Sequence, residues 1–182
     1  MAQCMLDAQN AATANTPVWD GESEIFIVDV EGFQMKQDFF IKELAFYNPY
    51  SKQMWSGVFH APFDRAYLKK KGQECIEYAT RNLHGLKWEQ GQYPYSMSYH
   101  LISHFGKKGN LYAKGSQKCA WLQQYTTSPV TNLDVFGCPQ AKDLPQAFLC
   151  IEHSSFEKTC AMDKAIRLGN HMAGLWEMKN VS

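Results

Sequence analysis

Three apolar runs that follow one another near the start of the chain constrain its fold more than any other feature. They are EIFIVDVEGF, DFFIKELAFYN and QMWSGVFH, and the turn-forming residues Gly32, Asn48 and Pro49 lie in or next to the ends of these runs. Short runs that are rich in Ile, Val and aromatic residues are typical of β-strands. Because breaks as short as these join antiparallel neighbours, the sequence predicts a three-stranded antiparallel meander at residues 24–33, 38–47 and 53–59.

Helical periodicity dominates the chain after the third run. Apolar spacing predicts helices at residues 64–85, 95–105, 116–126 and 159–178, with Asp64, Ser116 and Thr159 as N-caps. Short strands are expected between these helices, at residues 110–114 and 129–136. A strand that follows a helical crossover can join a sheet in parallel, so we expect the strand at 110–114 beside the first strand of the meander.

This succession of elements predicts an α/β domain whose five-stranded mixed sheet combines a three-strand antiparallel meander with two parallel strands and is flanked by helices. It is the element order of the ribonuclease-H-like fold. Residues 23–178 are expected to form this domain. Residues 1–22 have no steady apolar period and are expected to form a flexible N-terminal arm. The fold alone does not give the function.

Charge and composition narrow the class of protein. The chain has 182 residues, is 45% hydrophobic and carries 18 basic and 18 acidic side chains, which fits one domain without a global field that attracts polyanions. It shows neither a run of about 18 apolar residues nor the pattern of a secretion signal, so we expect an intracellular protein, cytoplasmic or nuclear or both, without a membrane partner. In such a compartment the six cysteines are expected to be thiols or metal ligands.

The first strand carries two carboxylates, in the segment VDVEGF. Asp29 and Glu31 are two positions apart, so both side chains point to the same face of the strand. Paired carboxylates suit divalent ions such as Mg2+, and two such ions can stabilise the attacking and leaving oxygens when a phosphodiester is cleaved. The alternative is that the two carboxylates face water at a strand end.

A second group of metal-binding side chains lies in LCIEHSSFEKTCAMDKA. Cys150, His153 and Cys160 would supply three zinc ligands, and a tetrahedral site needs a fourth. Cys138, in FGCPQ, is a candidate, because three thiolates and one imidazole are an ordinary composition for structural zinc. The alternative is that these cysteines are small core residues.

The chain from about residue 24 to residue 175 resembles the DEDD exonuclease superfamily, whose first motif is Asp-x-Glu. The resemblance implies a metal-dependent nuclease, such as a 3'-5' exonuclease, in which Asp29 and Glu31 hold Mg2+ or Mn2+. The later motifs depart from the pattern of that superfamily. Lys118 stands where the second motif has its aspartate, and TCAMDK, where the third motif would fall, gives Thr159 and Lys164.

Three other segments resemble the Maelstrom domain, a DEDD-related, ribonuclease-H-like domain of the germline small-RNA (piRNA) pathway. They are FIKELAFY, LYAKGSQKCAWLQQY and the terminal Cys-x2-His-x6-Cys-Ala. Maelstrom domains have often lost the catalytic carboxylates and carry a Glu-Cys-His-Cys set that binds zinc. Carried over to this sequence, that set is Glu43, Cys150, His153 and Cys160, so Glu43 competes with Cys138 as the fourth ligand. The retained Asp-x-Glu pair is a departure from that pattern.

Two functions follow from these observations. The first is a zinc-stabilised, Maelstrom-like domain that binds single-stranded RNA, with protein partners in a silencing pathway and without two-metal chemistry. For this function Lys114 and Lys118 would bind phosphate and Trp121 would stack on bases. The second is an active nuclease that uses Asp29 and Glu31 with Mg2+ or Mn2+. Maelstrom-like domains are also associated with cleavage of single-stranded RNA that does not use these carboxylates.

Overall fold

The structure is a computed structural model, and it describes residues 24–147 and 160–180. This part of the chain contains, in order, β1 (Glu24–Met35), β2 (Asp38–Tyr47), β3 (Met54–Val58), α2 (Lys70–Asn82), α3 (Tyr95–Lys108), β4 (Gly109–Ala113), α4 (Ser116–Gln123), β5 (Val130–Asn132) and α5 (Ala161–Asn180). Short 3-10 helices lie in the connections, namely η1 (Arg65–Tyr67), η2 (Leu133–Phe136) and η3 (Ala141–Asp143).

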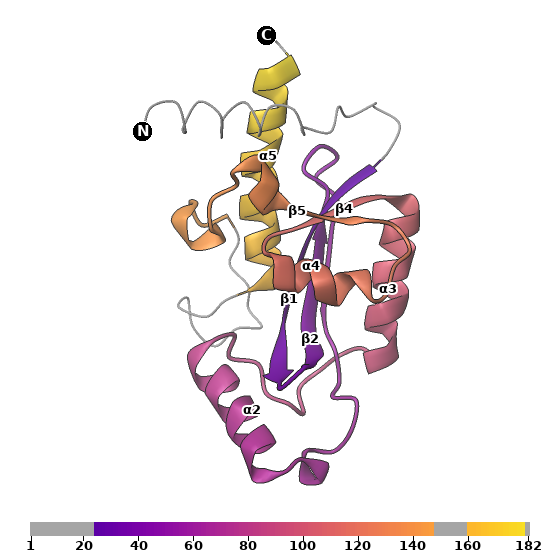
Figure 1. The fold of residues 1–182 in the computed structure, drawn as a ribbon, viewed down its shortest axis with the longest axis vertical. Helices are drawn as coiled ribbons and strands as arrows, with labels where there is room; N and C mark the ends of the chain where they lie inside the picture. Colours follow the sequence, from indigo (N-terminus) through magenta and orange to yellow (C-terminus); the bar gives the residue numbers. More distant parts are fainter. Residues whose placement is uncertain (1–23, 148–159, 181–182) are drawn as a thin grey trace.

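The strands form one mixed sheet in the order β3-β2-β1-β4-β5, with β1 at its centre (Figure 1). β1 pairs antiparallel with β2, and β2 pairs antiparallel with β3, so the predicted meander is confirmed. β4 pairs in parallel with β1, and β5 pairs in parallel with β4, as the helical crossovers predict. The predicted α/β class, with a five-stranded mixed sheet flanked by helices, is therefore confirmed.

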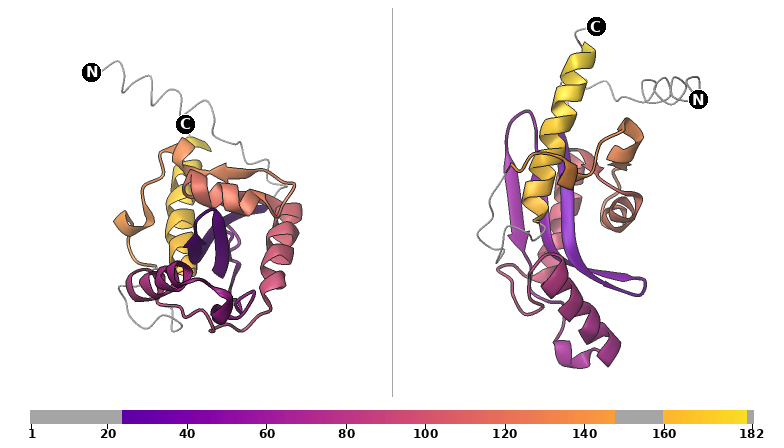
Figure 2. Two further views of the ribbon diagram at one scale, coloured as in Figure 1. Left: turned by 60° about the horizontal axis from the view of Figure 1, so that its bottom comes forward. Right: turned by 90° about the vertical axis from the view of Figure 1, so that its left-hand side faces the viewer.

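Helices cover both faces of the sheet. On one face, Ala165 of α5 shares a buried apolar cluster with Ile27 of β1. On the opposite face, Leu122 of α4 and Ile102 of α3 share a second cluster with Val28 of β1. Figure 2 shows α5 standing along the sheet, with α2 beyond the end of the β1–β2 hairpin. Within the described residues no helix combines the length and the apolarity that crossing a membrane requires.

The predicted N-caps need correction. Asp64 caps only the single turn η1, where it accepts a hydrogen bond from the Ala66 N–H at 2.8 Å, and α2 begins at Lys70. The N-cap of α4 is Gly115, whose φ of 93° suits a glycine, so Ser116 is the first helical residue. Three predictions fall outside the described residues: the cap at Thr159, the ligands Cys150 and His153, and the arm at residues 1–22.

A β-bulge interrupts the pairing of β1 with β2. The ladder pairs Glu31 with Glu43 but Gly32 with Ile41, so Lys42 is an extra residue on β2. The two backbones approach closely at this point. A Cβ atom on Gly32 would lie 2.2 Å from the carbonyl oxygen of Phe40, which explains the glycine.

The bulge directs the Lys42 side chain into the protein, where it is 1% exposed. Its ammonium donates hydrogen bonds to the backbone carbonyls of Phe59 at 2.8 Å, of Trp88 at 2.7 Å and of Gln90. Burial lowers the pKa of Lys42 to about 8, against the opposing charge of Glu89. One side chain thus links β2 to the end of β3 and to the loop before α3.

Lys42→Met should lower the free energy of unfolding by about 2–4 kcal/mol, because it leaves three buried carbonyls without their donor. Urea unfolding of the purified protein would measure the loss. Lys87→Met is the control, because Lys87 is exposed in the loop that Lys42 contacts, and it should change the stability by less than about 0.5 kcal/mol. Equal effects of the two substitutions would contradict a structural role for the Lys42 ammonium.

Candidate functional site: two carboxylates and two lysines

Asp29 and Glu31 lie on the central strand and on one face of it, as their spacing predicts. They alternate along β1 on the same side as Ile27, which α5 covers, and they are only 1% and 9% exposed. The pairing of β1 with β4 ends at Ile27 and Tyr112, so the carboxylates lie just beyond the last contact between these two parallel strands. Sheets of α/β proteins commonly bind ligands at the carboxyl ends of parallel strands.

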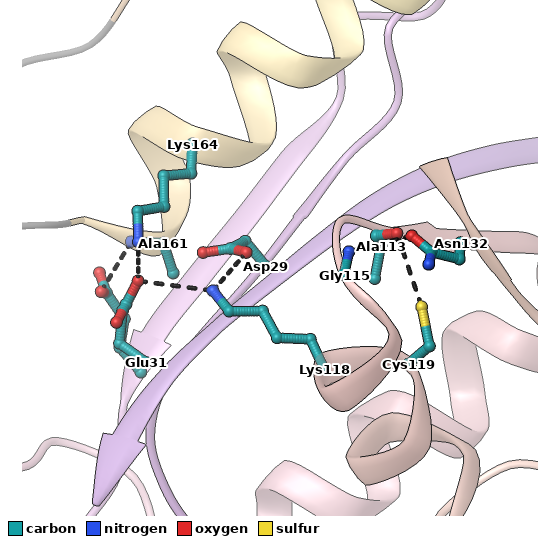
Figure 3. A network of polar contacts seen from close by, with 10 residues as sticks. Asp29, Glu31, Ala113, Gly115, Lys118, Cys119, Asn132, Ala161 and Lys164 are labelled. Atoms are coloured by element: carbon teal, nitrogen blue, oxygen red, sulfur yellow. Dashed lines mark hydrogen bonds and ion pairs between the residues drawn. The ribbon is translucent and has the colours of Figure 1, made fainter. Parts of the chain in front are cut away.

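Two lysines reach these carboxylates from two different helices (Figure 3). The Lys118 ammonium, from α4, lies 2.7 Å from Asp29 Oδ1 and 3.6 Å from Glu31 Oε1. The Lys164 ammonium, from the first turn of α5, lies 2.5 Å from Glu31 Oε1. Two negative and two positive charges meet here, so the formal charge of this carboxylate–lysine network is zero.

Burial and ion pairing shift the pKa values of these groups in opposite directions. Burial raises the pKa of Asp29, and the nearby Lys118 and Lys164 offset this only in part. Burial also acts to raise the pKa of Glu31, but the same two lysines outweigh it and bring that pKa to about 2. For Lys164, burial acts to lower the pKa, whereas Asp29 and Glu31 raise it above its usual value. Glu31 is therefore ionised at neutral pH and held by two ammonium groups.

Asp29 differs from Glu31 in having one oxygen without a partner. Its Oδ1 accepts from Lys118, but its Oδ2 is buried and has no hydrogen-bond partner within residues 24–147 and 160–180. An oxygen that is neither hydrated nor bonded disfavours the ionised carboxylate. Burial away from water is the main cause of the raised pKa of Asp29, and the negative charge of Glu31 adds to it.

A divalent cation would compete with the lysines for the same oxygens. Mg2+ binds carboxylate oxygens at about 2.0–2.1 Å, and the two ammonium groups already lie within hydrogen-bond distance of Asp29 Oδ1 and Glu31 Oε1. A metal ion at these oxygens would meet two positive charges at short range and would be repelled. Lys118 and Lys164 thus neutralise the carboxylates in the place of metal ions.

Glu43 lies directly opposite Glu31 in the ladder and contacts the start of α5. Its Oε2 accepts a hydrogen bond from the Ala161 N–H at 2.9 Å, and its Oε1 lies 3.7 Å from Cys160 Sγ. The usual zinc bond lengths and tetrahedral angles place an oxygen ligand and a sulfur ligand about 3.5 Å apart. In the structure this contact is a hydrogen bond that the Cys160 thiol donates to Glu43, at a separation close to that of two ligands of one zinc ion.

The other proposed zinc ligands are Cys138, Cys150 and His153. Cys138 is buried in the core beneath α5, and burial raises the pKa of its thiol to about 11. Cys150 and His153 belong to the segment that the structure does not describe. Among the residues that it does describe, no three His, Cys, Asp or Glu side chains are grouped as a metal site. Of the two candidates for the fourth ligand, Glu43 is the one for which the structure shows a contact with Cys160.

Of the three residues predicted to bind RNA, Lys118 and Trp121 line one cleft, whereas Lys114 is not part of its lining. Lys118 belongs to the carboxylate–lysine network, as described above. The Lys114 ammonium pairs with the Asp134 carboxylate and with the carbonyl of Cys138. Trp121 stacks flat on Phe39, with ring centroids 3.6 Å apart and an angle of 2° between the rings.

Two further residues of the site, Lys164 and Phe39, could not be assigned to it from the sequence. It marks Lys164 only as a departure from a motif, whereas the structure shows it as the closest partner of Glu31. Phe39 carries no local sign of its contact with Trp121, because the two are far apart in the chain and meet only through the packing of α4 against the sheet.

A scan of the chain against protein-family models gave no match, and a search of curated proteins gave no significant match. The function of this chain therefore has to be inferred from its own residues and from the resemblance that its sequence shows.

Glu31→Gln should destabilise the protein at neutral pH and do so less in acid. The pKa of Glu31 is depressed on folding, so ionisation of Glu31 contributes stability above about pH 4.5, and this contribution is lost as the pH falls toward about 2. Chemical denaturation at several pH values should show a gap between the wild type and the variant of up to about 3 kcal/mol near neutral pH. By about pH 3 this difference in the free energy of unfolding should be less than half of its value near neutral pH.

Glu77→Gln serves as the control for this pH series, because Glu77 makes an exposed ion pair with Arg65. Its effect on the free energy of unfolding should be small at every pH. A gap for Glu31→Gln that stays constant with pH would show that the ionised carboxylate contributes nothing to stability.

Proposed function

We propose that this chain is a zinc-stabilised, ribonuclease-H-like domain that binds single-stranded RNA, and that lysines stand in its DEDD-type site instead of catalytic metal ions. The sheet order β3-β2-β1-β4-β5, with Asp29 and Glu31 on the central strand, supports the ribonuclease-H-like assignment. The resemblance to the Maelstrom domain implies a role inside the cell in a small-RNA (piRNA) silencing pathway, with protein partners from that pathway.

One observation carries this proposal, namely the ion pairs of Lys118 and Lys164 with Asp29 and Glu31. A two-metal nuclease needs carboxylate oxygens to hold ions that also contact the attacking and leaving oxygens of the phosphate. An ammonium group neutralises a carboxylate but cannot activate a water molecule as a metal ion does. The retained Asp-x-Glu pair is therefore assigned to structure and not to catalysis.

The same ion pairs suit the binding of RNA. Two unneutralised carboxylates at the end of the central strand would repel a phosphodiester, and a nuclease overcomes this repulsion with metal ions. Here the network has a formal charge of zero without any added ion. RNA binding is expected to need neither Mg2+ nor Mn2+.

Zinc has a structural role in this proposal. Glu43, Cys150, His153 and Cys160 would hold the ion, and four protein ligands leave no open position for a hydrolytic water. The ion would join β2 to the start of α5, where Glu43 already contacts Cys160 and the Ala161 N–H. Because the ligands have to assemble for zinc to bind, its binding energy adds to the stability of the fold.

The purified protein should bind labelled single-stranded RNA equally well with and without added Mg2+ or Mn2+, and it should not cleave the RNA in either condition. The variant Lys118→Asp/Lys164→Asp places carboxylates at both lysine positions, so Mn2+ should raise its melting temperature but not that of the wild type. Lys107→Asp/Lys108→Asp makes the same change of charge in the last turn of α3 and should not respond to Mn2+.

Cleavage of RNA by the wild type that depends on Mg2+ or Mn2+, and that Asp29→Asn/Glu31→Gln abolishes, would overturn this proposal in favour of an active nuclease. An inactive wild type that fails to bind single-stranded RNA would overturn the RNA-binding part alone. Circular dichroism of each variant would show whether it is folded.

Elemental analysis should find about one zinc ion per chain. Glu43→Gln and Cys160→Ser should each lose most of the zinc and melt at a lower temperature, because each removes a ligand of the ion. Cys138→Ser should keep the metal. Zinc that is retained by Glu43→Gln and lost from Cys138→Ser would instead identify Cys138 as the fourth ligand.

A further inference from the structure

A cleft of about 490 Å³ opens beside the carboxylate–lysine network, between the β1–β2 hairpin, α2 and α4. Its lining is mostly apolar and includes Phe39, Tyr78, Leu83 and Trp121, together with Lys71 and Lys118. A cleft of this volume lies in the range that accommodates a small organic ligand or one unit of a larger one. Because Lys118 belongs both to the lining and to the network, the two sites are contiguous.

Flat aromatic surface is the main feature of this cleft. The stacked rings of Phe39 and Trp121 form one wall and also line a second, smaller cleft that contains Tyr99 and Tyr125. On the α2 side, Tyr78 is 61% exposed and Leu83 is 43% exposed. Exposed aromatic side chains beside a cleft provide the surface on which an unpaired base stacks, and stacking of this kind tolerates any base.

The charges at the mouth of the cleft favour an anion. Lys71 lies in the first turn of α2, which contains no acidic residue, and the exposed Lys69 and Lys70 precede it. Ammonium groups and free helix N–H groups both attract phosphate. Of the two acidic residues in the lining, Glu31 is paired with both lysines of the network, so Glu74 is the one that opposes Lys71.

We propose that this cleft binds one unstacked base of single-stranded RNA against its aromatic lining, with the adjoining phosphate at Lys71. The inference rests on the proposed RNA-binding function and assigns that function to a particular surface. Apolar walls alone would also accept a peptide side chain. Lys71 in the lining, with Lys69 and Lys70 just before it in the chain, and the neutralised Glu31 favour a ligand that is both flat and anionic.

Tyr78→Ser tests the base, because Tyr78 is exposed and its loss should leave the fold intact. In fluorescence anisotropy with labelled oligouridine, this variant should bind about 5- to 100-fold more weakly than the wild type, the range expected for one lost stacking contact. Tyr67→Ser is the matched control, since Tyr67 is 82% exposed and lies outside the cleft lining. It should bind within about two-fold of the wild type.

An abasic oligonucleotide of the same length separates base binding from phosphate binding. It should bind more weakly to the wild type than oligouridine does, and Tyr78→Ser should not weaken it further. If Tyr78→Ser weakens both ligands equally, the base is not what Tyr78 contacts, and the proposal is wrong.

Lys71→Ser tests the phosphate through the salt dependence of binding. The slope of log affinity against log salt should fall by about 0.7 when one contact between a lysine and a single strand is lost. Lys142→Ser, at an exposed position in η3, should leave the slope unchanged. An unchanged slope for Lys71→Ser would show that Lys71 does not contact a phosphate of the RNA.

The outcomes distinguish this inference from the function on which it rests. A wild type that binds no single-stranded RNA would overturn the proposed function. A wild type that binds RNA while Tyr78→Ser and Lys71→Ser behave like their controls would leave RNA binding in place and exclude this cleft. Photocrosslinking of RNA that contains 4-thiouridine gives a second measurement, and the crosslinked peptides should come from α2 or α4.

Discussion

Two carboxylates buried on the central strand have to be neutralised, and the placement of the helices around them follows from this requirement. An unpaired charge at a buried position costs several kcal/mol. Lys118 meets Asp29 from the beginning of α4, and Lys164 meets Glu31 from the first turn of α5. The loss of Lys118 would break the ion pair of Asp29, and the loss of Lys164 would break the shorter ion pair of Glu31. The network therefore holds β1, α4 and α5 as one unit, and the site cannot be changed without changing the stability of the fold.

The sheet could be predicted from the sequence because its signals are local. Composition, turn residues and crossover length predict five strands, although residues 133–136 of the last one form η2 instead. A spacing of two residues places Asp29 and Glu31 on one face. Their partners could not be predicted, since Lys118 is 89 positions from Asp29 and Lys164 is 133 positions from Glu31. The burial of Lys42 has no sequence signal either. Lysine is normally exposed, and the three acceptors of Lys42 are backbone carbonyls, which any residue provides.

The two described zinc candidates, Glu43 and Cys160, lie beside the charge network, where the β1–β2 pair contacts the start of α5. Glu31 and Glu43 are cross-strand partners, and they contact Lys164 and Cys160 respectively. Cys160 and Lys164 lie four positions apart, and the Lys164 N–H donates to the carbonyl of Cys160 at 3.1 Å. A shift of the first turn of α5 would therefore move both residues together. In the proposed function, metal binding has moved from the place where a nuclease holds its reacting phosphate to the neighbouring strand, where it stabilises the fold.

The bulge at Lys42 makes this site sensitive to the length of the chain. If the ladder continued from the Gly32–Ile41 pair without a bulge, Lys42 would stand opposite Glu31, and Glu43 would turn away from α5 to the other face of the sheet. The bulge thus places a carboxylate and not an ammonium beside Glu31, and many substitutions at residues 34–39 would leave this register intact. In evolutionary terms, relatives of this chain should keep the number of residues between Glu31 and Glu43 even where the residues themselves have diverged.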